Sequence, residues 1–226
     1  MKPEIEKFDE VVAGLTGPGQ PFEVNTIELG GVEYRNFAAL PANLGAYYQV
    51  MQQHADKDFA VYLEERYTFG EGYQHSCEFG AALVEGYGVG KGDRVAILSR
   101  NNPQWLMAMI AITSIGAVAV PMNAWWTTEE LDYGIADSGA TVVVADRARV
   151  ERLIPIVKKH GLRLITVDDC SGLAVDHTPF SELLQEYSGA GMPQVDVTLE
   201  DHATIMYTSG STGHPKGALS SHRGVL

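Results

Sequence analysis

Short apolar runs alternate with helical patterns along the middle of the chain, and this alternation limits the fold more than any other feature. Apolar or β-prone runs occupy residues 94–98, 117–121, 141–145 and 162–167, with helical patterns between them, as at 127–138 and 147–160. Strand, helix and strand at this spacing predict right-handed βαβ units. Runs that are apolar throughout are typical of strands covered on both faces. The sequence therefore predicts an α/β fold, with a mostly parallel sheet and helices on both faces.

The helix starts in this region carry clear capping signals. Asn102 precedes Pro103, which fits the first position of a helix because its missing N–H costs nothing there. Thr127 and Glu130 form a capping box for a helix that we expect to end near Ser138. The apolar stretch at residues 105–120 is too short to span a bilayer and is closed by Pro121. It predicts a buried helix that leads into a buried strand.

The first part of the chain has a different pattern. Residues 1–21 are largely polar and end among glycines and prolines, which we interpret as a docked or loose arm. Alternating runs on either side of Gly30 and Gly31 predict a hairpin over 22–37, and residues 59–69 predict a second one. Asn43 is expected to cap a helix whose core stripe is Leu44, Tyr47, Tyr48 and Met51. We predict three parts: an arm and hairpin (1–40), an α/β subdomain (41–200) and a phosphate-loop segment (201–226).

Composition narrows the class of partner. The chain has 226 residues, 45% of them hydrophobic, and a net charge of −13, as in a soluble globular protein that binds neither nucleic acid nor an anionic membrane. Anion binding must then be local. Cys77 and Cys170 show neither metal-ligand spacing nor a disulfide framework, and the N-terminus has no apolar signal core. We therefore expect a cytoplasmic protein with no transmembrane segment.

A run rich in glycine and hydroxyl residues lies near the end of the chain. It comprises Thr208, Ser209, Gly210, Ser211, Thr212 and Gly213, and it follows an apolar run at 203–207 that predicts a buried strand. Such a run in isolation is most often an exposed loop. Here Pro215 and Lys216 follow it, so that backbone N–H groups, hydroxyls and a mobile cation are together, as phosphate binding requires. Lys216 lies three residues after Gly213, unlike the lysine of the common nucleotide loop. Residues 218–221 look more like a second strand than the start of a helix, so the loop is expected to join two strands.

Residues 207–217, Tyr-Thr-Ser-Gly-Ser-Thr-Gly-His-Pro-Lys-Gly, resemble the phosphate-loop signature of the adenylate-forming (AMP-binding) superfamily. This superfamily includes acyl-CoA synthetases, luciferases and peptide-synthetase adenylation domains. Segments at 65–69, 90–97, 116–123 and 137–140 are also similar to it, so that the resemblance covers roughly residues 40–226. Trp125, Trp126 and the leading hairpin look most like a bacterial fatty-acyl-CoA synthetase.

The resemblance implies the N-terminal part of an ATP-dependent acid–CoA ligase that uses ATP, Mg²⁺ and CoA. A carboxylate, expected to be that of a fatty acid, would attack the α-phosphate of ATP, and CoA would then displace AMP. Ser209, Gly210, Ser211, Thr212 and Gly213 would hold the β- and γ-phosphates, Thr208 would lie near Mg²⁺, and Lys216 would neutralise pyrophosphate, with Gly217 ending the motif. The later motifs and the C-terminal catalytic lysine of the superfamily are absent, so we assign no catalytic residue here. We interpret the chain as an N-terminal fragment that binds ATP weakly or not at all and is inactive alone.

Several readings stay open. His214 is interpreted as a spacer within the loop and His222 as a strand-end histidine without a ligand role. The expected partners are a small carboxylic acid and the missing C-terminal part of the same enzyme, with a homodimer as a further possibility. The alternatives are an adenylation enzyme for an amino or aryl acid, and a non-catalytic binding or dimerising module with a vestigial loop.

Overall fold

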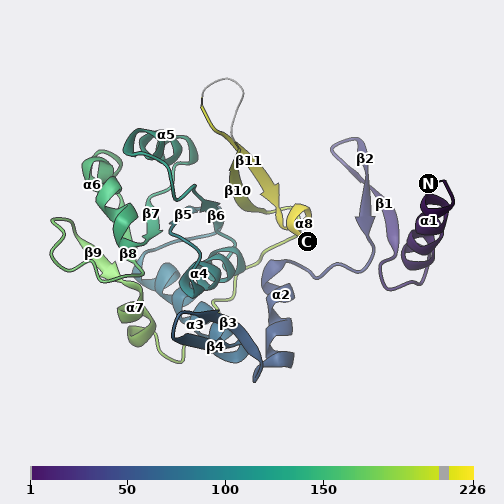
Figure 1. The fold of residues 1–226 in the computed structure, drawn as a ribbon, viewed down its shortest axis with the longest axis horizontal. Coiled ribbons are helices and arrows are strands. Elements are labelled where there is room, and N and C mark those ends of the chain that lie inside the picture. Colours follow the sequence, from purple (N-terminus) through teal and green to yellow (C-terminus); the bar gives the residue numbers. More distant parts are fainter. Residues whose placement is uncertain (1, 209–213) are drawn as a thin grey trace. The chain divides into compact units, whose positions relative to one another are not determined.

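The computed structural model describes residues 2–208 and 214–226, with side chains from residue 7 onward (Figure 1). The chain divides into two compact units, Met1–Pro41 and Ala42–Leu226. Both hydrophobic clusters of buried residues belong to the second unit.

The first unit contains a helix and a hairpin. Helix α1 (Lys2–Thr16) is followed by β1 (Val24–Leu29) and β2 (Val32–Phe37), which pair antiparallel. Gly30 and Gly31 connect the strands with φ values of 59° and 80°, which a two-residue hairpin turn of this kind needs and which glycine adopts without strain. The predicted hairpin is confirmed. Most of residues 1–21, which we interpreted as a docked or loose arm, form α1.

The second unit begins with short elements. They are α2 (Leu44–Tyr48), η1 (Gln49–His54), β3 (Asp58–Tyr62), β4 (Glu65–Thr68), α3 (Phe69–Ala81) and η2 (Ala82–Gly86). The side chain of Asn43 accepts a hydrogen bond from the N–H of Ala46, so the predicted cap is present. Strands β3 and β4 form the second predicted hairpin. The stripe assigned to the core is only partly buried: Leu44 and Met51 are buried, but Tyr47 is half exposed.

A seven-stranded sheet forms the centre of the second unit, with the order β11-β10-β6-β5-β7-β8-β9. Its elements are β5 (Arg94–Leu98), α4 (Pro103–Ser114), β6 (Val118–Pro121), α5 (Thr128–Ser138), β7 (Val142–Ala145), α6 (Arg147–His160), β8 (Arg163–Thr166), β9 (His177–Pro179), α7 (Phe180–Glu186), β10 (His202–Thr208), β11 (Lys216–Ser221) and α8 (His222–Val225). Every pair of neighbours is parallel except β10 and β11, which form an antiparallel hairpin at one edge. The predicted α/β fold with a mostly parallel sheet is confirmed.

Helices cover both faces of this sheet (Figure 1). Alternate residues of a strand point to opposite faces. On β5, Val95 and Ile97 pack in the cluster formed with α3, α4 and α7, whereas Ala96 and Leu98 pack in the cluster formed with α5 and α6. All four are fully buried, which explains why these strands read as continuous apolar runs.

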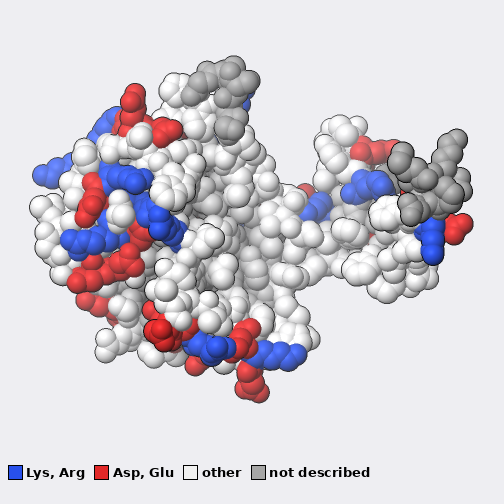
Figure 2. Space-filling model, in the orientation of Figure 1, with Lys and Arg blue, Asp and Glu red and all other residues white. Residues whose placement is uncertain are grey.

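The surface reflects the same arrangement. Figure 2 shows acidic and basic side chains interspersed over the α6 side of the second unit, whereas the surface leading to β10 and β11 carries few charges. Most of the apolar stretch at residues 105–120 is buried, in α4 and then in β6, as predicted, although Leu106 is 40% exposed. Among the described residues, no helix has the length and apolar character needed to cross a bilayer.

Candidate nucleotide-binding site

The hairpin of β10 and β11 brings two of the predicted site residues together. Thr208, the last residue of β10, lies directly opposite Lys216, the first residue of β11, and both are exposed. The other predicted phosphate ligands between them, Ser209, Gly210, Ser211, Thr212 and Gly213, lie outside the described residues. A hydroxyl and a mobile cation therefore face each other at the base of the loop. The prediction that this loop joins two strands is confirmed.

Gly217 has a steric role in the hairpin. It lies opposite Tyr207, and a Cβ at this position would approach Cγ2 of Ile205 to 2.8 Å and the Tyr207 ring to 3.4 Å. A larger residue would therefore displace a side chain that packs against the core. The glycine of the motif allows β10 and β11 to remain paired next to the loop.

Tyr207 anchors β10 to helix α5. Its hydroxyl donates a hydrogen bond to Oδ2 of Asp137 at 2.6 Å, and its ring meets that of Trp126 edge-on at 5.3 Å. Burial, reinforced by the hydrogen bond to the Asp137 carboxylate, raises the pKa of Tyr207 well above its ordinary value. The phenol is thus a neutral donor at physiological pH. It holds the strand to α5 through this hydrogen bond.

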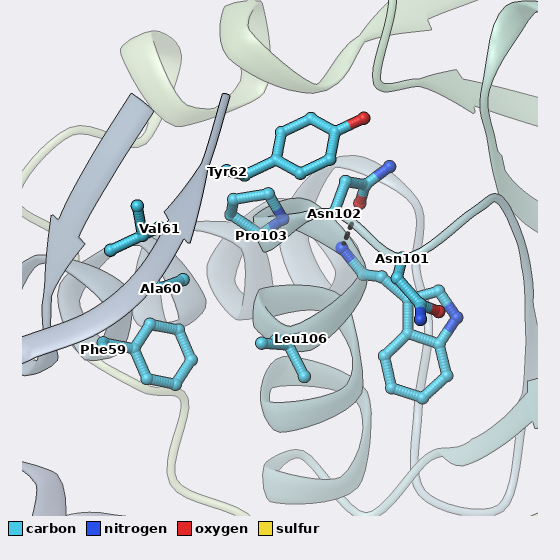
Figure 3. A pocket seen from close by; sticks show the side chains of 9 residues that line it. Phe59, Ala60, Val61, Tyr62, Asn101, Asn102, Pro103 and Leu106 are labelled. Carbon is cyan, nitrogen blue, oxygen red and sulfur yellow. Dashed lines mark hydrogen bonds between the residues drawn. The ribbon is translucent and has the colours of Figure 1, made fainter. Parts of the chain in front are cut away.

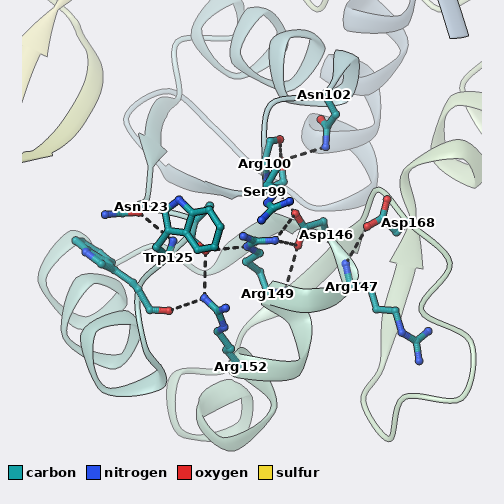
Figure 4. Close-up of polar contacts among 12 residues, drawn as sticks. Ser99, Arg100, Asn102, Asn123, Trp125, Asp146, Arg147, Arg149, Arg152 and Asp168 are labelled. Carbon is teal, nitrogen blue, oxygen red and sulfur yellow. Dashed lines mark hydrogen bonds and ion pairs between the residues drawn. The ribbon is translucent and has the colours of Figure 1, made fainter. Parts of the chain in front are cut away.

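A second cluster of polar side chains lies where β5 and β7 end (Figure 4). The chain leaves β5 toward β6 on one side and reaches β7 on the other, so the strand order reverses here. Ligands of open α/β sheets bind beyond the carboxyl ends of the strands at such a reversal. Arg100 follows β5, and Asp146 follows β7.

A buried ion pair organises this cluster. Asp146 and Arg149 are 6% and 4% exposed, and Nη1 of Arg149 lies 3.1 Å from Oδ2 of Asp146. The same carboxylate accepts the N–H of Arg100 at 3.0 Å. Nε of Arg149 donates to the carbonyl oxygen of Ala124, and Arg152 donates to that oxygen and to the carbonyl of Trp126. The loop after β6 is therefore tied to the start of α6.

This loop presents an exposed aromatic ring next to a cation. Trp125 is 67% exposed, and the guanidinium carbon of Arg100 lies 4.7 Å from its ring centre. Both residues line an open pocket of about 760 Å³. Within the described part of the chain, no carboxylate forms an ion pair with Arg100. An aromatic face beside a guanidinium can stack on a base and bind a phosphate.

A more apolar pocket of about 520 Å³ adjoins this one (Figure 3). Residues of β3, among them Phe59 and Val61, face the start of α4, where Leu106 lies. The two pockets share Tyr62, Asn101 and Trp105 in their linings. The surface at the carboxyl end of β5 thus changes from cationic to apolar over a short distance.

The sequence interpretation missed the cluster at the ends of β5 and β7. We call it the Arg100 cluster; it comprises Arg100, Trp125, Asp146, Arg149 and Arg152. The available signal was positional: Arg100 and Asp146 follow two predicted parallel strands, whose carboxyl ends share one edge of a sheet.

The structure also changes the interpretation of His214, whose ring stacks on that of Tyr133 at 4.7 Å. His222 does follow the last strand, as predicted, but it is fully buried.

The metal assignment of Thr208 stays a prediction. No group of three or more His, Cys, Asp and Glu side chains that could hold a metal occurs among the described residues. A Mg²⁺ ion bound with a triphosphate usually takes few protein ligands, and an exposed hydroxyl beside the loop fits one of them.

Known proteins are similar to this chain in sequence and in fold. The chain is 27% identical over 215 residues to 4-hydroxybutyrate–CoA ligase 2 of Metallosphaera sedula, covering 88% of this chain and 39% of that protein. It is 29% identical over 198 residues to a long-chain-fatty-acid–CoA ligase of Salmonella typhimurium, covering 77% and 35%. The crystal structure of the anthranilate CoA ligase AuaEII with anthranoyl-AMP has the same fold, with a TM-score of 0.73 and 22% identity over 81% of this chain and 36% of that one.

The chain spans less than two fifths of the length of these relatives. The sequence profile described as "AMP-binding enzyme" matches residues 47–226, which include the whole sheet, the hairpin and the Arg100 cluster. On this match, the protein belongs to the AMP-binding enzyme family and is related to acid–CoA ligases.

Proposed function

We propose that this chain supplies the triphosphate-binding hairpin of an AMP-forming acid–CoA ligase. The observation that carries the proposal is the pairing of Thr208 with Lys216 at the base of the glycine-rich loop. The positive charge of Lys216 suits the β- and γ-phosphates, and the Thr208 hydroxyl suits their Mg²⁺ ion. In phosphoryl and nucleotidyl transfer, positioning and charge neutralisation provide most of the rate. These residues would hold the phosphates while a carboxylate attacks.

We assign the nucleotide portion of CoA to the Arg100 cluster. Trp125 offers an exposed ring on which adenine can stack, and Arg100 offers a guanidinium without a carboxylate partner among the described ion pairs. The buried pair of Asp146 and Arg149 fixes the backbone that carries both residues. A site that is already ordered binds with less loss of conformational entropy.

The acid that we favour is a fatty acid. The long-chain-fatty-acid–CoA ligase among the relatives and the bacterial synthetase pattern at Trp125 and Trp126 support this choice. Aryl acids are the second candidate, because the anthranilate CoA ligase shares the fold. We place the enzyme in the cytoplasm.

Ligand-observed saturation-transfer NMR on the 226-residue chain tests the two binding assignments separately. MgATP and CoA should each give a signal, because the method detects weak binding. Lys216→Ala should reduce the ATP signal and leave that of CoA, whereas Arg100→Ala with Trp125→Ala should do the reverse. Arg66→Ala, which removes an exposed arginine from β4, serves as the control for lost charge. Equal losses in all three variants, or none, would contradict the proposal.

A further inference from the structure

Helix α5 contacts strand β10 and also His214, two residues before β11 begins. On the β10 side, the Tyr207 hydroxyl donates to Asp137 at 2.6 Å and approaches the carbonyl oxygen of Gly134 at 3.3 Å. On the β11 side, the His214 ring stacks on Tyr133 with an angle of 22° between the ring planes. Tyr133 and Asp137 are four residues apart and therefore lie on one face of α5. One face of a single helix holds the chain before and after the loop.

The hairpin needs such support near the loop, because the rest of the sheet supports only the end that is far from the loop. Strand β10 pairs with β6 at Thr204 and Ala119, so its last residues have only β11 as a strand neighbour. A two-stranded hairpin alone is marginally stable in water. The contacts to α5 occur at Tyr207 and His214, where the support from β6 has ended.

Helix α5 is itself firmly fixed. Thr127 and Glu130 form a capping box at its start, and Gly139 ends it with φ of 66°. Leu131 and Ile135 are almost fully buried against the sheet. Trp126, just before the helix, packs so closely that a Cβ on Gly134 would lie 2.6 Å from its ring. The face that carries Tyr133 and Asp137 therefore has a set position.

We propose that Tyr133 and Asp137 form an α5 clamp that positions Thr208 and Lys216 for the polyphosphate of the nucleotide. Tyr133 and Asp137 are positioning residues: they act through His214 and Tyr207 and do not touch the ligand. The clamp lowers the conformational freedom of Thr208 and Lys216 before binding, so less entropy is lost when the phosphates arrive. The assignment of the ligand rests on the proposed function, whereas the restraint of the hairpin does not.

Hydrogen exchange of the 226-residue chain tests the clamp without any nucleotide. In Tyr133→Ala and Asp137→Ala, amides at 205–208 and 216–219 should exchange about tenfold faster, since loss of one such contact favours local opening by that factor. Tyr133→Phe keeps the stacked ring and should exchange like the wild type. Asp132→Asn is the matched control, because Asp132 lies on α5 but pairs with Lys159 and His160. Unchanged exchange in both alanine variants, or equally fast exchange in the control, would overturn the clamp.

The dissociation constant of MgATP gives the second measurement, by NMR titration of the same variants. Tyr133→Ala should weaken MgATP binding about tenfold. Tyr133→Phe, which keeps the stacked ring, should bind MgATP like the wild type. Faster hairpin exchange with unchanged ATP affinity would refute the positioning role. If Tyr133→Ala does not fold, His214→Ala removes the same stack from an exposed residue and must give the same two results. If the wild type binds no ATP, the proposed function fails while the exchange data still decide whether the clamp exists.

Discussion

The backbone N–H of Leu44 donates a hydrogen bond of 3.1 Å to Nδ1 of His222, a residue 178 positions later in the chain. His222 is fully buried, and its other ring nitrogen, Nε2, has no hydrogen-bond partner within the described structure. The acceptor role of Nδ1 requires a neutral ring. Burial lowers the pKa of His222, Asp201 acts in the opposite direction, and Lys91 adds to the lowering. The start of α2 is thus linked to the start of α8 through a histidine that must stay uncharged.

This linkage predicts a loss of stability in mild acid. Because the folded pKa lies below the unfolded value of about 6.5, the unfolded chain binds more protons as the pH falls below that value. The contribution of neutral His222 to the free energy of unfolding should be complete above pH 6.5. It should decrease as the pH falls toward the folded pKa. In His222→Asn the amide oxygen can still accept from Leu44 without titrating. Urea titrations at pH 7.5, 6.5 and 5.5 should show a smaller decrease for this variant. The wild type and His222→Asn share the other six histidines. If the free energy of unfolding decreases equally with pH in the two proteins, the role of His222 is refuted.

The buried pair of Arg149 and Asp146 predicts a large destabilisation when one partner is removed. Arg149→Ala leaves a buried carboxylate without its cation and should lower the free energy of unfolding by roughly 3–5 kcal/mol. Arg66, in contrast, pairs with Asp58 at an exposed position, so Arg66→Ala should cost less than about 1 kcal/mol. Urea unfolding at pH 7 measures both. Similar losses in the two variants would contradict the account.

The pair of Lys91 and Asp201 predicts a different pH dependence. Nζ of Lys91 lies 2.7 Å from Oδ2 of Asp201, and this contact, with the N–H and hydroxyl of Thr198, lowers the pKa of Asp201 to about 2. A lowered carboxyl pKa gives stability that is present above the unfolded value of about 3.9 and is lost as the pH falls through the folded value. Asp201→Asn should therefore be less stable than the wild type at pH 7, by about 1 kcal/mol for a partly exposed pair. The difference should shrink between pH 4 and pH 2. A constant difference across this range would exclude the assignment.

Two helical glycines differ in the space around them, so their substitution by alanine should have opposite effects on stability. Gly134→Ala would place a methyl group 2.6 Å from the buried ring and should destabilise the chain by about 1–3 kcal/mol. Gly14 lies inside α1 with no neighbouring atom within 4 Å, so Gly14→Ala should stabilise its helix by about 0.5–1 kcal/mol. Thermal unfolding, followed by tryptophan fluorescence for the first variant and by helical circular dichroism for the second, measures these changes. A neutral Gly134→Ala would show that Trp126 can move freely.

The sequence predicted the elements of the sheet well where local signals and burial agree. The runs around Val95 and Val143 are buried on both faces, and Asn102 and Thr127 form the predicted caps. Such features depend on neighbours in the sequence. Strand β9, with the residues His-Thr-Pro, has no apolar run and exists because β8 offers an edge, so it was missed. Helix α1 was missed although Phe8, Val11 and Leu15 recur at helical spacing, and these side chains stay largely exposed.

The candidate site was predictable only in part. The motif at 207–217 located the hairpin, but nothing in it indicates that Tyr133 and Asp137 would meet it. That contact depends on the strand order, which places β10 next to β6 and so beside α5. The bond between Leu44 and His222 depends likewise on the fold, since no local pattern links residues so far apart.

A phosphorus-31 NMR titration of the 226-residue chain with MgATP and AMP, in the wild type and in Lys216→Ala, tests the central claim most directly. The wild type should bind MgATP with a dissociation constant above the micromolar range, shifting the β- and γ-phosphate resonances, and should bind AMP more weakly. Loss of the charged contact at Lys216 should weaken MgATP binding about tenfold and leave AMP unaffected. Equal affinity for ATP and AMP, unchanged in Lys216→Ala, would contradict the claim that the hairpin binds the triphosphate.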